Sequence, residues 1–115
     1  MPKMSSKNYN IKMLSVFEKQ LKRLSKKYPS LKNDLSSLIT SLKQNPEQGD
    51  YLGNQCYKIR LAISSKGKGK SGGTRVITHI VVAETTVFLL SIYDKSEQAD
   101  IPDKEIDALV KMIYL

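Results

Sequence analysis

The sequence predicts an α+β fold in which helices pack on a mostly antiparallel sheet. Two amphipathic helical patterns lie in the first half of the chain, and alternating, β-branched runs follow them. A last helical pattern closes the sequence. The expected order is β-α-α-β-β-β-α, with a helical hairpin and the C-terminal helix on the sheet, because sequential strands with short links pair antiparallel. A length of 115 residues predicts a single domain spanning 1–115.

The N-terminal part predicts a strand and then a helix. Apolar and polar side chains alternate over 9–14, which indicates the strand. Ser15 and Glu18 have the spacing of a capping box, in which the two side chains satisfy free N–H groups of the first turn. The helix ends before Pro29, which breaks helices. Its apolar stripe consists of Phe17, Leu21, Leu24 and Tyr28.

A second helix follows directly and completes the helical hairpin. Ser30 is its expected cap, and Asn45-Pro46 ends it. Its apolar stripe consists of Leu31, Leu35, Leu38, Ile39 and Leu42.

The second half of the chain predicts three strands and a helix. From Tyr57 to Ser64 apolar residues alternate with polar or small ones, and the β-branched runs 75–83 and 86–93 form a hairpin. Between these strands lies a glycine-rich basic loop, SSKGKGKSGGT, at 64–74. The last helix begins near Pro102.

Charge is distributed unevenly along the chain. Nineteen Lys and Arg against eleven Asp and Glu give a net charge of +8. The segment 56–75 contains six basic residues and no acid, whereas 84–107 contains seven acids and two lysines. This pattern favours a polyanionic partner that binds the middle segment. An anionic membrane or an acidic protein would also satisfy the net charge.

Composition narrows the class of protein. No apolar stretch is long enough for a membrane span, and the polar N-terminus has no signal-peptide core. The single cysteine, Cys56, cannot form an internal disulfide, so we expect a cytoplasmic protein with no membrane partner. We expect Cys56 and His79 to be packed residues. With one His and one Cys, no metal-ligand cluster is expected.

Three sequence runs resemble one known family. These are YKIR at 57–60, KGKGKSGGTRVI at 66–77 and LSIYDKSE at 90–97. Together with the helix sequence FEKQLKRL at 17–24, they resemble the RelE/ParE superfamily of bacterial type II toxins, and most of all a HigB-like branch of the RelE toxins. The resemblance covers nearly the whole chain.

The resemblance implies an mRNA interferase that acts in the ribosomal A site. The ribose 2′-hydroxyl attacks the adjacent phosphate and leaves a cyclic phosphate and a 5′-hydroxyl. This reaction needs a base, positive charge for the phosphorane oxygens and an acid, but no metal or other cofactor. The implied partners are mRNA, the ribosome and a cognate antitoxin, which in HigB-like systems is a helix-turn-helix protein.

The family's site residues can be matched to positions of this chain. Lys58 and Arg60 match the paired basic residues of the second strand, and Arg75 matches the arginine that opens the next one. Lys95 follows the last strand, where RelE has an arginine. Lys58 is the candidate base. Neighbouring cations lower the pKa of a lysine, and a lysine that has lost its proton can accept one from the 2′-hydroxyl. Lys66, Lys68 and Lys70 of the glycine-rich loop are expected to bind RNA phosphates.

The chain departs from RelE at one catalytic position. RelE has a C-terminal tyrosine that stacks on a base, and the matching residue here is Ile101. Tyr93 and Tyr114 are the candidate substitutes, and Tyr93 is the stronger one because it lies beside Lys95.

Other functions remain open at this level. ParE-like relatives with the same fold inhibit DNA gyrase, and an RNA-binding module without catalysis would also need these cations. Lys58 and Arg60 could instead form a solvated strand face, and the basic loop could serve only solubility. Arg75 could pair with Glu84 or Asp94.

Overall fold

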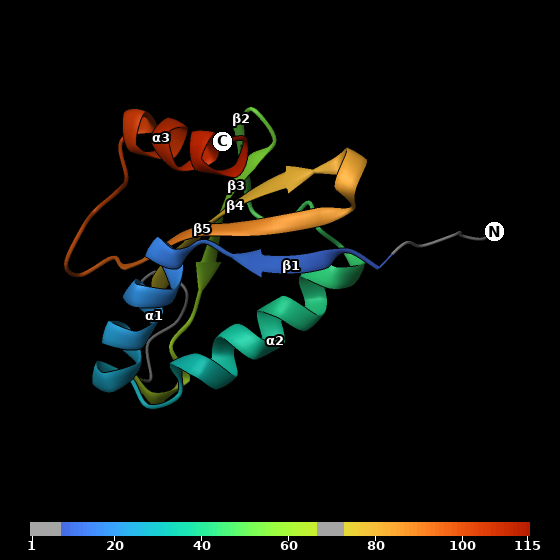
Figure 1. Ribbon diagram of the computed structural model, residues 1–115. Helices are drawn as coiled ribbons and strands as arrows, with labels where there is room; N and C mark the ends of the chain where they lie inside the picture. Colours follow the sequence, from blue (N-terminus) through green and yellow to red (C-terminus); the bar gives the residue numbers. More distant parts are fainter. Residues whose placement is uncertain (1–7, 67–72) are drawn as a thin grey trace.

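The sheet of the protein lies between two helical layers (Figure 1). The structure, a computed structural model, describes residues 8–66 and 73–115, so Lys68 and Lys70 lie outside the described residues. The elements are β1 (Asn10–Met13), α1 (Ser15–Lys27), α2 (Leu31–Gln44), β2 (Asp50–Gly53), β3 (Cys56–Leu61), β4 (Thr74–Val81), β5 (Thr86–Asp94) and α3 (Asp103–Ile113). The predicted α+β fold is confirmed. Within the described residues, no helix is long and apolar enough to cross a membrane.

The five strands form one sheet in the order β1-β5-β4-β3-β2. β1 runs parallel to β5, and all other neighbours are antiparallel. β2 was not predicted, because its four residues bury no side chain and so carry no apolar alternation. It pairs with the first half of β3 and leaves the outer edge of Ile59–Leu61 open.

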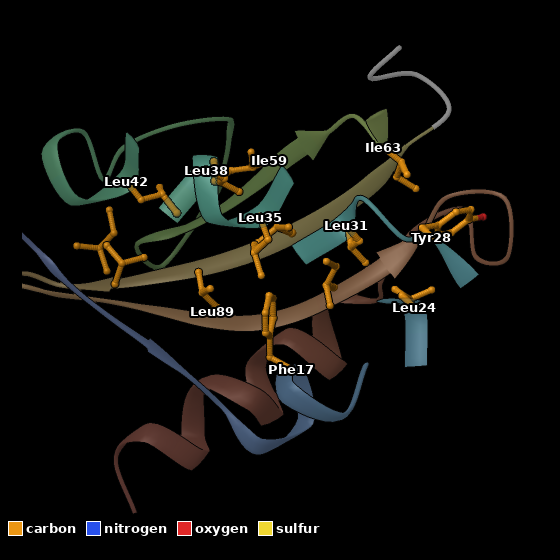
Figure 2. Packing of buried hydrophobic residues seen from close by; sticks show 14 residues of the cluster. Phe17, Leu24, Tyr28, Leu31, Leu35, Leu38, Leu42, Ile59, Ile63 and Leu89 are labelled. Carbon is orange, nitrogen blue, oxygen red and sulfur yellow. The ribbon is translucent and has the colours of Figure 1, made fainter. Parts of the chain in front are cut away.

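Two apolar cores cover the two faces of the sheet. Helices α1 and α2 pack their leucines against one face (Figure 2). Helix α3 packs on the opposite face (Figure 1). Burying one such leucine stabilises the fold by about 1.5–3 kcal/mol. The α1/α2 core includes Phe17, Leu24, Leu31, Leu35, Leu42, Ile59 and Leu89, and the α3 core includes Cys56, Ile77, Leu90, Tyr93, Ile101, Ile106, Leu109 and Val110.

The expected helix caps are only partly formed. Leu14, not Ser15, is the N-cap of α1 and no side chain caps it, so the capping-box prediction is wrong. Ser15 lies inside the helix because Leu14 continues the pairing of β1, with its N–H donating to the Leu89 carbonyl at 3.1 Å. Ser30 is the N-cap of α2 as expected, but its hydroxyl donates to Asp34 (2.8 Å) instead of accepting from the helix.

A bulge in β5 sets the direction of its last side chains. Ile77 pairs with Ser91 and Thr78 pairs with Leu89, so Leu90 is an extra residue without a partner on β4. An extra residue reverses the alternation of all residues beyond it. As a result, Leu89 faces α1 and α2 whereas Tyr93 faces the α3 side.

Candidate active site

Three predicted site residues form a row across the sheet. In the strand register Arg60 of β3 lies opposite Arg75 of β4, and Arg75 lies opposite Tyr93 of β5. Lys58 lies two residues from Arg60, on the same face of β3, because Ile59 between them points into the α1/α2 core. The predicted common face of Lys58 and Arg60 is therefore confirmed. We call Lys58, Arg60, Arg75 and Tyr93 the cationic row.

The members of the cationic row differ in exposure. The Arg60 side chain is 59% exposed, and its Nη2 forms an ion pair with Asp50 Oδ2 at 3.9 Å. The Lys58 side chain is 24% exposed. Arg75 is buried, and its Nη1 donates to the Thr74 carbonyl at 3.2 Å. Arg60 and Arg75 lie directly opposite each other on neighbouring strands, so positive charge is concentrated at this position of the sheet.

An acid that the sequence analysis had not selected lies in this site. Asp100, in the loop between β5 and α3, accepts hydrogen bonds at Oδ1 from Lys58 Nζ (3.3 Å) and the Tyr93 hydroxyl (3.3 Å). The Ile101 N–H donates to the same oxygen at 2.9 Å. The bond from Ile101 and the ion pair with Lys58 lower the pKa of Asp100. Burial and the nearby Asp100 charge raise the pKa of Tyr93 to about 12.

The other face of the sheet at this end carries a separate polar network. The Asp94 carboxylate accepts hydrogen bonds from the Tyr28 hydroxyl, Lys27 Nζ (3.3 Å) and Ser96. Burial opposes its charge, but these bonds outweigh burial and place the pKa of Asp94 well below its ordinary value. Lys66 joins this network, with Nζ 3.4 Å from the Tyr28 hydroxyl. Thus Lys66 points toward α1 and away from the cationic row.

The remaining predicted site residues lie apart from the row. Lys95 is exposed just beyond β5, and its N–H donates to the Gly73 carbonyl at 3.2 Å. Ile101 is buried in the α3 core, so a base cannot stack there. The Tyr114 hydroxyl lies 2.9 Å from His79 Nε2, and His79 Nδ1 lies 3.3 Å from Cys56 Sγ. Cys56 and His79 are buried, as predicted.

The surface beside the row is hollowed. A cavity of about 300 Å³ lies along the edge of β3, and its lining includes the partly exposed Lys58 and the exposed Arg60. Gly49 borders it with a φ of +93°, and a side chain there would collide with the Lys58 carbonyl. Within residues 8–66 and 73–115, no group of three His, Cys, Asp or Glu could hold a metal ion.

Comparison with known proteins decides the family. The model of the RelE toxin of the RelE/RelB toxin–antitoxin system matches residues 14–114. The chain belongs to the RelE toxin family. It is the toxin component of a type II toxin–antitoxin system, with the mRNA interferase function of that family.

Solved structures agree with the fold of this RelE-family toxin. A mutant E. coli RelE in the free state matches with a TM-score of 0.60 at 20% identity, over 92% of this chain and 98% of that one. The E. coli RelBE complex gives 0.60 at 19%, over 75% and 95%. The RelBE2 complex of Mycobacterium tuberculosis gives 0.56 at 18%, over 81% and 94%.

Proposed function

We propose that this toxin cleaves mRNA in the ribosomal A site, with the scissile phosphate bound at the cationic row. The observation that carries the proposal is the placement of Arg60 directly opposite Arg75, next to the partly exposed Lys58. The positive charge of these three side chains attracts a phosphate group. The exposed Arg60 guanidinium can donate two parallel hydrogen bonds to the phosphate. The buried Arg75 contributes its positive charge from within the sheet.

The proposed cleavage reaction depends on fixed positive charge close to the scissile phosphate. When the 2′-hydroxyl attacks the adjacent phosphate, negative charge builds up on the phosphorane oxygens, and fixed cations stabilise it. The ion pair with Asp100 is made by the ammonium form of Lys58, which donates hydrogen bonds. Lys58 therefore serves as a phosphate ligand in this arrangement, and a role as the base requires loss of the pair with Asp100.

The partners follow from the same proposal. The ribosome supplies the mRNA in the A site, and the net charge of +8 favours binding to ribosomal and messenger phosphates. The RelBE structures contain toxin–antitoxin complexes, which supports a cognate antitoxin for this chain. We expect a helix-turn-helix antitoxin and a cytoplasmic location, where translation takes place.

The test is mRNA cleavage in a reconstituted translation reaction, mapped by primer extension with and without ribosomes. Arg60→Ala removes an exposed cation, so the fold is retained while cleavage falls by about 10²–10³-fold. Lys43→Ala, which removes another exposed cation at the end of α2, is the matched control and cleaves like the wild type.

New 5′ ends at A-site codons that require ribosomes and disappear with Arg60→Ala support the proposal. Intact mRNA with unimpaired translation contradicts it. A DNA gyrase supercoiling assay then tests the ParE-like alternative. RNA binding without any cleavage would instead indicate a binding module.

A further inference from the structure

One carboxylate approaches the cationic row from a distant part of the sequence. Asp100 belongs to the acidic C-terminal third of the chain, and its side chain is 65% exposed. The next residue, Ile101, is buried under α3 and fixes this part of the loop. The backbone N–H of Ile101 also holds Asp100 Oδ1, so the carboxylate has a defined orientation.

The same carboxylate oxygen connects two strands that are not neighbours. Lys58 belongs to β3 and Tyr93 to β5, with β4 between them. Both donate to Asp100 Oδ1 at 3.3 Å. The carboxylate therefore spans the row above β4 and ties together two of its four members.

We propose that Asp100 is a positioning residue of the RNA-cleaving site, which holds the Lys58 ammonium and the Tyr93 hydroxyl in fixed places beside the scissile phosphate. This inference rests on the proposed function. Lysine has a long, flexible side chain, and holding it before RNA binds removes the need to order it at the moment of reaction. The ammonium group has three N–H donors, so two remain for phosphate oxygens after one is given to Asp100.

Positioning by an acid has a recognisable signature. The Asp100 charge repels RNA phosphates, so its removal leaves RNA affinity unchanged or raises it. Removal also releases Lys58 and Tyr93, so the cleavage rate falls. A purely structural role would not separate the two quantities in this way, because loss of folded protein lowers the binding signal and the cleavage rate together.

The experiment compares three variants in single-turnover cleavage on programmed ribosomes, and in binding of an RNA with a 2′-deoxy nucleotide at the cleavage site. Asp100→Ala is expected to cleave about tenfold more slowly at saturation, with equal or tighter binding. Asp100→Asn keeps an oxygen acceptor for all three donors, so it retains most of the rate. Asp103→Ala, the loss of another exposed acid three residues later, is the matched control and cleaves at the wild-type rate.

A second measurement does not depend on cleavage. In ¹⁵N-lysine NMR spectra, the hydrogen-bonded Lys58 ammonium gives a slowly exchanging signal, assigned with Lys58→Met. It is expected in the wild type and in Asp103→Ala, and it is lost in Asp100→Ala. Thermal unfolding of each variant verifies that it is folded.

The two proposals fail in different ways. If the wild type does not cleave RNA, the proposed function fails, while the Lys58 signal still tests whether Asp100 holds it. If the wild type cleaves and Asp100→Ala cleaves at the same rate or faster, Asp100 does not position the site and the inference is overturned. Loss of the Lys58 signal together with slower cleavage and undiminished binding supports it.

Discussion

The side of the sheet that faces α3 has two ends with opposite character. At one end α3 covers apolar side chains and the buried residues Cys56 and His79. The other end carries the cationic row, in which Arg60 is largely exposed, Lys58 is partly exposed, and Arg75 and Tyr93 are buried. A single set of strands thus carries a closed apolar end and an open charged end.

The closed end contributes mainly to the stability of the fold, and under the proposed function the open end contributes mainly to binding of RNA. The closed end removes apolar surface from water, which favours folding. The open end places Arg60 opposite Arg75, and the Asp100 carboxylate forms an ion pair with Lys58 there. Substitutions at the closed end should therefore change mainly the free energy of unfolding, and those at the open end mainly cleavage.

The largest effect on stability is expected at the closed end. Leu109→Ala removes a buried leucine of α3 and leaves a cavity, so the free energy of unfolding should fall by about 2–4 kcal/mol. Urea denaturation measures this change. Met112→Ala, at a half-exposed position of the same helix, is the control and should cost much less. Equal losses in the two variants would show that α3 does not cover a tightly packed core.

An intermediate effect on stability is expected at the Asp94 network, which lies on the other face of the sheet from the cationic row. Tyr28→Phe removes a donor to the buried Asp94 carboxylate and should cost about 1.5–3 kcal/mol at pH 7. Because the pKa of Asp94 is lowered on folding, its contribution is present above about pH 4 and is lost as the pH falls further. In Tyr28→Phe this pKa rises, so acid unfolding followed by circular dichroism should begin at a higher pH.

Tyr57→Phe is the control for Tyr28→Phe. Within residues 8–66 and 73–115 the Tyr57 hydroxyl has no hydrogen-bond partner, so its loss should leave acid unfolding unchanged. If both variants unfold at the wild-type pH, the hydrogen bond from Tyr28 does not stabilise the charged Asp94 carboxylate.

The smallest effect is expected at the hydrogen bond between α3 and His79. Tyr114→Phe removes it at a partly exposed site and should cost about 0.5–1.5 kcal/mol. Burial lowers the pKa of His79, so the unfolded chain takes up a proton more readily, and stability should fall as the pH drops below about 6.5. His79 is the only histidine, so an NMR titration measures its pKa directly. A pKa at or above 6.5 would contradict its burial as a neutral ring.

Much of the fold could be predicted from local patterns. The apolar stripes of α1, α2 and α3 and the alternation in β3 recur in the buried residues of the two cores. Alternation alone placed Lys58 and Arg60 on one face, because neighbouring side chains of a strand point to opposite sides. The short edge strand β2 was not predicted, because it is defined by its pairing with β3. The sequence also did not show that the Ser30 hydroxyl donates to Asp34 instead of capping the helix.

The sequence by itself determined the helices, the longer strands, the charge distribution and the two cations of β3. Only the tertiary structure decided which charges share a surface. Period-two alternation along β5 would put Tyr93 on the same side as Leu89, and one bulge turns it to the face of Arg75. Asp100 accepts a hydrogen bond from Lys58 of the basic segment although the two residues are 42 positions apart in the sequence. Side-chain direction depends on strand register and loop path, and both are set by packing between distant segments.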